Sequence, residues 1–558
     1  MDVTDVQNKD LIPSMADHKA LYDNYLVHIQ RILVKRIPAL QCLGNHVPKH
    51  IKHRHSEEMS KQSKKMQMGI IFESEVTNEG IVKVLQQCQQ YVATVGEEDK
   101  IRFDEQGLVG DQLTIERAVN ALKSMANGYT PLDRLEGFHF GIADWHAGVK
   151  FLSNIFNNLY SPKSAGEACT MYSDRNLINR RNVKADVHEA YTQCKEFFLL
   201  EFEARVVAAA LKILGMSSID ASPVTMKMPH LAQEENDNQS ILGRLYLFKV
   251  AKAILDMFVI ANSKAADIIS AVLDEDEIDQ INSRQMVTPE GRFMCRSPGC
   301  PATFKHDGKR KRDHEQQHNP PPVTEDVTFN ENTTTSTELK QTKKDDSYNY
   351  NCCLINYGLL FTEFLDAVGE GDGDRNLRCW KMFLLHFKKD SGSTKYAVEA
   401  LYYTLQVNSL LTPRQAYRLQ WNRSVKGKGS NVPLDLDLEH DNKGLKEEIR
   451  KLGRNLTEKA VTRVCKSQFV KRQMVDNFDA TIHKIKKSGK HTVRSDSKDF
   501  MTILNKLIAE DTLEFRDGRS LPSFPGISSD PLNGLDIHSL YKWINDHKKY
   551  ISLDKRAR

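Results

Sequence analysis

Two cysteines and two histidines in the middle of the chain have the spacing of a metal site. Cys295 and Cys300 are followed by His314 and His318 in a C-x4-C-x13-H-x3-H pattern. Two thiolates and two imidazoles can close a tetrahedral Zn²⁺ site. The histidines are four residues apart, so on a helix they would share one face. The pattern therefore predicts structural zinc held by these four side chains.

The residues around these ligands predict a ββα-type zinc finger over residues 290–319. Phe293 and Phe304 stand where small fingers keep core side chains. The spacer between the cysteine pair and the histidine pair is one residue longer than the common length of about 12. The position three residues before His314, usually a core leucine, is Lys311. We therefore expect a finger with an unusual core.

A basic run between the two ligand pairs predicts contact with a polyanion. The run consists of Lys309, Arg310, Lys311 and Arg312. Its charge favours contact with the phosphates of a nucleic acid. The base-reading positions of such a finger would fall on Asp307, Arg310 and Asp313, and two carboxylates disfavour an anionic groove. Sequence-specific reading by this finger alone is not expected, and a purely structural zinc clip is the alternative.

Three carboxylates are candidates for a second, catalytic metal site. Asp111 follows an apolar segment that we expect to be a strand, and Asp144 and Asp366 are the candidates for the other two ligands. His139 is an alternative for the second ligand and Glu363 for the third. A two-metal nuclease holds Mg²⁺ or Mn²⁺ between acidic ligands that converge from distant points of the chain. The alternative is that these carboxylates only cap turns and helices.

A second basic region lies near residues 445–472, where we expect a pair of helices. Its density of Lys and Arg, including Arg450, Lys451 and Arg454, predicts a surface for the DNA backbone. The alternative is an ordinary solvated helix face. The preceding segment 427–442, a Gly/Lys-rich loop followed by acidic residues, could bind phosphate or metal, or could simply precede the helix as a polar loop.

Composition limits the remaining classes of function. The chain has 558 residues, enough for two to four domains, and a net charge of +4, so any nucleic-acid contact must be local. The 10 cysteines are scattered, which is typical of reduced thiols in the cytosol or nucleus. The N-terminus has no apolar signal core, and the apolar segment 245–273 is interrupted by charges, so we expect no membrane partner.

Apolar periodicity and loop composition suggest how the chain is divided. We expect a helical region over 1–95, a first part of an α/β core with a helical insertion over 96–285, and the finger over 290–319. A disordered linker would follow over 320–347, then a second, helical part of the core with basic helices over 348–485, and a tail over 486–558 with one short helix. Within the core we expect strands near 101–114 and 135–142, and a helix that begins after Thr114 as its N-cap.

Several segments together resemble one protein family. They are residues 110–117, 138–146, 356–360 and 431–442. Their combination resembles the domain of unknown function 6589 family, whose members are widespread, multicopy and similar to mobile-element products. The resemblance covers roughly residues 25 to 525, and we expect this chain to lack an N-terminal region that longer members have. The finger, which ends in His-Asn-Pro-Pro, resembles one that animal members carry.

The resemblance implies a fold and a function as expectations. The layout is similar to that of transposases with an RNase H-like core interrupted by a large helical insertion, although a helix is expected directly after Asp111, where such a core has a β-hairpin. On that similarity Asp111, then His139 or Asp144, then Glu363 or Asp366 would hold the catalytic metals.

The sequence therefore predicts a helix-rich α/β, transposon-derived, zinc-containing protein of the nucleus that binds nucleic acid, most simply DNA. One hypothesis is an active or decayed transposase or nuclease. The alternative is a non-enzymatic DNA-binding or adaptor protein with zinc as a structural clip. A homo-oligomer is left open.

Overall fold

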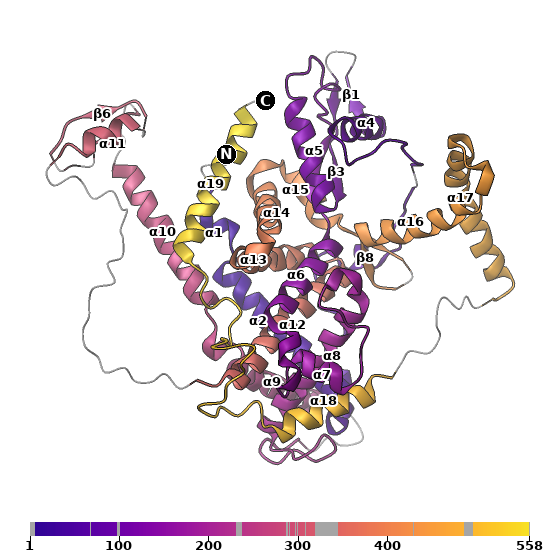
Figure 1. The fold of residues 1–558 in the computed structure, drawn as a ribbon, viewed down its shortest axis with the longest axis vertical. Helices are drawn as coiled ribbons and strands as arrows, with labels where there is room; N and C mark the ends of the chain where they lie inside the picture. The colour runs from indigo at the N-terminus through magenta and orange to yellow at the C-terminus, as the bar shows by residue number, and fades with distance from the viewer. Residues whose placement is uncertain are drawn as a thin grey trace.

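The computed structural model describes residues 6–66, 68–96, 101–229, 237–285, 288, 291–295, 297, 299–306, 309–318, 344–427, 429–484 and 495–556. Figure 1 shows a mostly helical molecule in which the strands form only short pairs. The helix-rich character of the predicted fold is therefore confirmed. Most of the predicted linker, residues 320–343, lies outside the described residues.

The helical body is built around α12 (Asp346–Glu370). It packs against α2 (Met15–Arg36), α6 (Asp144–Leu159), α8 (Tyr191–Leu214) and α13 (Gly373–Lys389). One continuous apolar core contains buried side chains from all five helices. Segments from both sides of the predicted finger therefore share a single core, since burial of the apolar helix faces requires them to meet.

Glycine ends the two longest helices of this body. The backbone of Gly215 after α8 has a φ of 65°, and that of Gly371 after α12 has a φ of 70°. Glycine adopts this left-handed conformation without a steric penalty because it has no Cβ. Asp372 then caps α13 by accepting hydrogen bonds from the backbone N–H groups of Asp374 and Arg375. The chain therefore makes a tight corner between two core helices at Gly371 and Asp372.

Further helices cover the body or extend from it. They are α1 (Asn8–Leu11), α3 (Ser56–Ser60), α4 (Asn78–Gln89), α5 (Gln112–Ser124), α7 (Met171–Leu177), α9 (Asp237–Phe258), α10 (Ala265–Gln285), α11 (Lys309–Glu315), α14 (Thr394–Leu405), α15 (Pro413–Trp421), α16 (Leu434–Arg450), α17 (Glu458–Thr481), α18 (Ser497–Ala509) and α19 (Ile537–Arg556).

The segment after 486, predicted to be a tail with one helix, contains both α18 and α19. The prediction of a single helix was therefore wrong. Both helices contribute buried side chains to the main core, so this segment is part of the packed body.

A small α/β lobe carries the first predicted strand and its acidic end. The strand β3 (Gln106–Gly110) pairs in parallel with β4 (Phe138–Ile142), and α4 and α5 pack over this pair around a separate apolar cluster. The helix after β3 is capped by Asp111 and not by Thr114, because the Asp111 carboxylate accepts a hydrogen bond of 2.7 Å from the Thr114 N–H. The predicted Thr114 cap was therefore three residues too late.

The RNase H-like core is not confirmed. In the part of the chain that the structure describes, the strands form four separate two-stranded sheets. Besides β3–β4, these are the antiparallel pairs β1 (Thr94–Val95) with β2 (Arg102–Phe103), β5 (Phe293–Met294) with β6 (Thr303–Phe304), and β7 (Ser424–Lys426) with β8 (Asn431–Pro433). The helix α5 follows Asp111 directly, where an RNase H-like core would continue with a β-hairpin.

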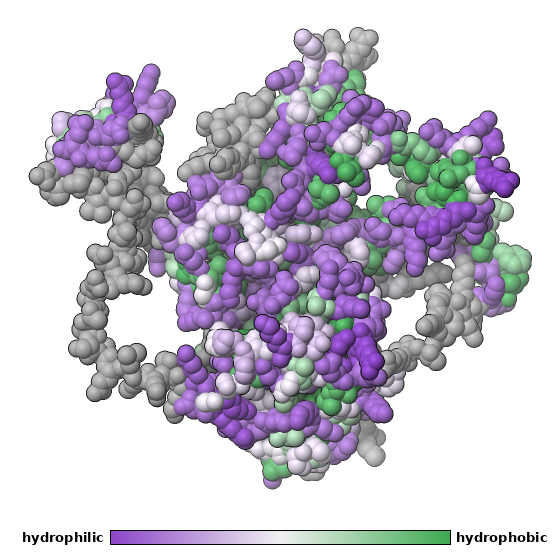
Figure 2. Space-filling view, viewed as in Figure 1, coloured by the Kyte–Doolittle hydropathy of each residue, from purple (hydrophilic) through white to green (hydrophobic). Residues whose placement is uncertain are grey.

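Two parts of the chain extend away from the body in Figure 1. The unit of β5, β6 and α11, called the ββα unit below (residues 291–318), is drawn beyond the end of α10. The helices α16 and α17, called the basic hairpin below (residues 434–481), pack on each other and project on the opposite side. The basic hairpin is also where Figure 2 shows green, apolar surface beside purple, polar surface.

One helix of the described chain is long and apolar enough to cross a membrane by length and composition alone. This helix is α12, and 72% of its most apolar window is buried inside the protein. A helix at the centre of a core passes the same test, so this finding gives only weak evidence for a membrane span.

Candidate metal centre and the predicted acidic site

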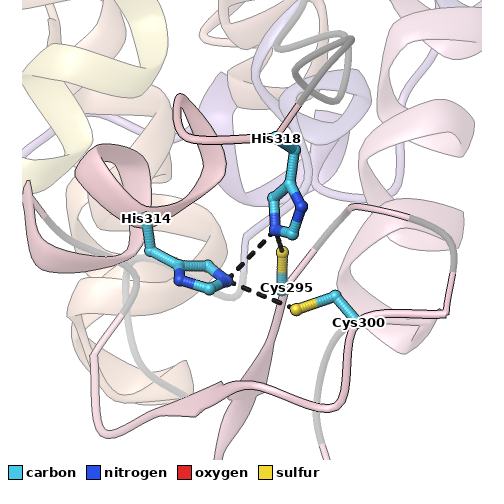
Figure 3. Close-up of side chains that lie close together, drawn as sticks. All are labelled: Cys295, Cys300, His314 and His318. Atoms are coloured by element: carbon cyan, nitrogen blue, oxygen red, sulfur yellow. Dashed lines mark hydrogen bonds between the residues drawn. The ribbon is translucent and has the colours of Figure 1, made fainter.

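The four predicted zinc ligands converge in the ββα unit. Cys295 follows β5, and its N–H donates a 2.9 Å hydrogen bond to the carbonyl of Ala302 beside β6. Cys300 stands in the turn between the strands, His314 lies on α11, and His318 lies just beyond the end of that helix. Figure 3 shows the four side chains pointing toward one another.

The distances within this group fit a single ion. One ligand atom from each residue lies within 4.8 Å of all the others. The Cys295 Sγ is 3.4 Å from the His318 Nε2, the Cys300 Sγ is 3.3 Å from the His314 Nε2, and the two Nε2 atoms are 3.2 Å apart. Four atoms at such separations surround a point at tetrahedral metal–ligand range, and two sulfurs with two imidazoles suit a borderline-soft cation. The group could therefore hold a metal ion.

The structure corrects the prediction that Lys311 contacts phosphate. Its side chain is fully buried, with its Nζ 3.9 Å from the Glu315 carboxylate and 5.7 Å from the centre of the Phe293 ring. Lys311 thus occupies the core position that usually holds leucine, and Glu315 and Phe293 accommodate its charge there. Arg310 is exposed. The side chains of Lys309 and Arg312 lie outside the described residues.

Asp144, predicted as the second catalytic ligand, belongs to a buried ion pair. It accepts hydrogen bonds from Arg423, at 2.7 Å from Nη2 and 2.9 Å from Nε, and from the Trp380 indole at 2.8 Å. Both Asp144 and Arg423 are almost completely buried. The pair joins the start of α6 to the segment after α15, so it fastens two distant parts of the chain to each other.

Glu363 and Asp366, the alternatives for the third ligand, meet at Arg375. Arg375 donates two hydrogen bonds to Glu363, at 2.9 and 2.6 Å, and one to Asp366 at 2.8 Å. Asp366 also accepts from Arg31 at 2.9 Å, and the Nε2 of His28 lies 2.7 Å from Glu363. Burial alone would raise the pKa of Glu363, but the hydrogen bonds and charges of Arg375 and His28 lower it to about 2.

Asp111 and His139 do not complete an acidic site. Asp111 caps α5. His139 is buried in β4 with neither ring nitrogen hydrogen-bonded, and its pKa is lowered to about 4, first by burial and then by the charge of Arg418. Among the described residues, the cysteine–histidine group is the one place where three or more such ligand atoms come close enough to hold an ion. The predicted convergence of Asp111, Asp144 and Asp366 on one ion is therefore not found there, because arginines already neutralise two of the three.

Comparison with known proteins places the chain in a family. The model of the family of unknown function DUF6589 matches residues 4–491. The chain belongs to this family. No curated protein and no solved structure matches the chain.

Three of the segments that carry the DUF6589 resemblance meet in space. They are the β3–α5 junction, the β4–α6 junction and the start of α16, and α16 contacts both β3 and α6. The Asp435 carboxylate on α16 accepts hydrogen bonds from the N–H groups of Trp145 and His146, at 3.2 and 3.0 Å, and lies 2.8 Å from the His146 ring. Asp435 therefore caps α6 from a distance of 290 residues along the chain.

His146 marks the place where these junctions of the DUF6589 chain come together. Burial lowers its pKa, but the hydrogen bond and charge of Asp435, with the charges of Asp111 and Glu439, raise it above the ordinary value. Sequence reasoning placed Asp111 here correctly as an acidic strand end but missed Asp435 and His146 as its neighbours. The available signal was the alternation of acids in residues 435–439, part of the segment for which the sequence left open phosphate or metal binding or a polar loop before the helix.

The predicted DNA-contacting residues of the basic hairpin are at its tip. Arg450 ends α16, Lys451 caps it, and Arg454 lies in the turn that leads to α17, and all three are exposed. Lys451 lies 2.8 Å from Glu448, and Lys471 on α17 lies 3.3 Å from the same carboxylate. Exposed pairs of this kind are weak, so they leave the tip free to exchange these partners for a polyanion.

Proposed function

We propose that this protein is a transposon-derived nucleic-acid-binding protein of the nucleus in which Zn²⁺ holds the ββα unit as a C2H2-type zinc finger. The observation that carries the proposal is the convergence of two thiols and two imidazoles in a strand–strand–helix unit. Zinc would link both strands to α11, and so stabilise a unit that is too small to fold on its own core. The nucleic acid is most simply DNA, since a DNA element is what the family resemblance suggests.

The second support is the charge of the basic hairpin. Arg450, Lys451 and Arg454 form an exposed cationic tip, while Arg310 is exposed on α11. Such side chains bind phosphate through charge and counterion release, without reading bases. With Lys311 buried, the finger itself presents less charge than its sequence suggests. We therefore assign the main phosphate contact to the basic hairpin.

Metal content tests the zinc part of the proposal. We expect one zinc per chain by mass spectrometry of the native purified protein, and loss of that zinc in Cys300→Ser and in His314→Ala. The matched control is Cys42→Ser, because Cys42 is a free, exposed cysteine outside the ββα unit. Zinc retained by Cys300→Ser, or none in the wild type purified without chelator, would reject the assignment.

Binding of a labelled random-sequence DNA duplex tests the nucleic-acid part. Replacing Arg450, Lys451 and Arg454 by glutamine should weaken binding for every sequence, and should reduce the slope of log affinity against log salt by up to about 0.9 for each lost phosphate contact. The control replaces Lys163, Lys184 and Lys227, which are exposed on other segments. Equal loss in both triple variants would mean that binding reflects net charge only.

A metal-dependent nuclease is the second candidate function. The specific observation in its favour is that the Asp435 carboxylate lies 2.8 Å from the His146 ring, which also feels the charge of Asp111, at the carboxyl ends of two parallel strands, where α/β proteins commonly bind ligands. These three residues do not by themselves form a group close enough to hold an ion, so a bound substrate phosphate would have to complete the site. Nicking of plasmid DNA with Mn²⁺, lost in Asp111→Asn and in Asp435→Asn but kept in the exposed control Asp133→Asn, would support it. Absence of nicking by the wild type would leave the binding protein as the function.

A further inference from the structure

A buried arginine in α8 is shared by two acidic side chains. Arg205 is fully buried, and its Nη1 donates a hydrogen bond to the carboxylate of Glu201, one turn earlier on the same helix. Its Nη2 lies 3.5 Å from the carboxylate of Asp174 on α7. The side chains of Asp174 and Glu201 are 1% and 0% exposed. Two acids and one base are therefore enclosed together, and these three residues are called the buried charge cluster below.

Every N–H group of Arg205 already has an acceptor. Its Nε donates to the Asn351 side chain at 2.7 Å, and its Nη1 donates both to the Glu201 carboxylate and, at 3.2 Å, to the Glu201 carbonyl. Its Nη2 donates to the Cys169 carbonyl at 2.7 Å and to Asp174. A guanidinium has five N–H donors, so none is left for the second oxygen of Glu201. That oxygen, Oε1, is buried and receives no hydrogen bond from any group that the structure describes.

Two ionised acids in the buried charge cluster would leave one negative charge in excess. The titratable groups that face the cluster do not balance this charge. Burial raises the pKa of Cys169 and of Tyr350, so both side chains stay uncharged at neutral pH. On α18, Lys506 acts on Asp174 from a distance, but it forms its own ion pair with Glu510, 2.6 Å away at the surface. A buried charge without a partner is strongly destabilising, so the cluster needs one proton to balance it.

We propose that Asp174 and Glu201 hold a single proton between them in the folded protein at neutral pH, and that this proton keeps α7 attached to α8. The two carboxyl groups are hydrogen-bonded to each other, and such a bond requires one of them to carry a proton. One carboxylic acid, one carboxylate and one guanidinium together have no net charge. Because the two acids interact strongly, the proton belongs to the pair and not to one residue.

Loss of this proton makes the buried charge cluster a pH-sensitive switch. When solvent hydroxide removes the proton, two carboxylates face each other with one guanidinium and no water to solvate the excess charge. The cluster also holds the start of α7, since Asp174 lies in its first turn and the Cys169 carbonyl just before it accepts from Arg205. Cys169 has a left-handed φ of 61°, which a residue with a side chain keeps only where its surroundings hold it. We expect α7 and the turn before it to loosen as the pH rises.

Urea unfolding from about pH 5 to about pH 9 tests the proposal through the sign of the pH dependence. Burial, and then the charge of Asp174, raise the pKa of Glu201 well above its ordinary value of 4.5. The stabilisation from the protonated group is therefore present below pH 4.5 and is lost as the pH rises. Glu201→Gln keeps a donor toward Asp174 and has no proton to lose, so its urea midpoint should rise relative to that of the wild type as the pH rises. A relative midpoint that falls with pH would mean that both acids are ionised, and would reject the proposal.

Glu363→Gln is the matched control for this pH series. Glu363 is equally buried, and burial alone would raise its pKa, but the hydrogen bonds and charges of Arg375 and His28 lower it to about 2. Its midpoint should stay at a constant distance below that of the wild type over the same range. The double variant Asp174→Asn with Glu201→Gln removes both counter-ions of Arg205, so it should lose more stability than the two single variants together. Additive losses would contradict a shared proton.

Infrared difference spectroscopy of the folded protein gives a readout that does not depend on stability. A carboxylic acid has a C=O stretch at a higher frequency than a carboxylate, so the wild type at neutral pH should show a protonated carboxyl band. The band should be missing in Glu201→Gln and in Asp174→Asn, because the remaining carboxylate then balances Arg205 by itself. Hydrogen exchange in α7 should be faster in the wild type than in Glu201→Gln at alkaline pH and equal in both at pH 5. A wild-type spectrum without this band would overturn the proposal.

Discussion

Glu363 shows why the predicted carboxylates are not equivalent. It is fully buried, yet it accepts hydrogen bonds from Asn24 and Arg375 and lies against His28. A buried carboxylate is stable only when donors surround it, and here every donor comes from α2 or α13. Such a carboxylate holds helices together. A metal ion that took the place of its partners would leave the buried positive charge of Arg375 without its Glu363 counter-ion.

Glu363→Gln should therefore destabilise the helical body. Removing one partner of a buried ion pair costs about 3–5 kcal/mol. The pKa of Glu363 is about 2 in the folded protein, below its ordinary value of 4.5, so its stabilisation is fully present above pH 4.5 and is lost as the pH falls toward 2. The difference between variant and wild type in thermal unfolding, followed by far-UV circular dichroism, should be largest at pH 7 and shrink below pH 4.5. The exposed control Glu136→Gln should change little at either pH, and a difference independent of pH would contradict this account.

Close packing of α12 against α8 depends on a residue without a side chain. A Cβ added at Gly358 would overlap the ring of Phe202, which is itself buried in α8. The two helices can approach this closely only because Gly358 leaves room for the ring. Glycine inside a helix costs up to about 1 kcal/mol relative to alanine, so here the packing outweighs the local helix preference.

Gly358→Ala should destabilise the protein by about 1–3 kcal/mol, because overpacking of a dense core exceeds the gain in helix propensity. The matched control is Gly369→Ala in the same helix, where the nearest atom to an added Cβ is 3.8 Å away. That substitution should be neutral or slightly stabilising. Urea unfolding of both variants beside the wild type provides the measurement, and equal effects would mean that the Phe202 contact is not what limits position 358.

The whole molecule separates a packed body from two projecting parts. The main apolar core draws on segments from Val6 to Ile544, while the ββα unit extends beyond α10 in Figure 1. A metal in the ββα unit would thus stabilise that unit without contributing to the body. The basic hairpin projects elsewhere, so phosphate contact and metal binding belong to different parts of the chain.

Chelation should unfold the ββα unit alone. Hydrogen exchange followed by mass spectrometry should show faster exchange over residues 291–318 after a zinc chelator, because the cysteines and histidines lose their common ligand. The amides of α12 and α13 should keep their protection, and far-UV circular dichroism should change little since α11 has only 7 residues. Loss of protection in α12 would contradict the independence of the two parts.

The amino-acid sequence by itself determined the features that depend on local spacing. The Cys295 to His318 pattern, the strand near Phe138 and the corner after α12 follow from ligand spacing, apolar periodicity and glycine. Only the tertiary structure decided which acidic side chains are paired with a basic side chain, and with which one. Asp144 meets Arg423 across 279 residues, and Glu363 meets His28 across 335. Such pairs depend on the packing of whole helices, and no periodicity in the sequence records which helices will meet. The burial of Lys311 has the same cause. A run of basic residues predicts an exposed surface, and only the tertiary structure shows that Lys311 is buried near Phe293 and Glu315.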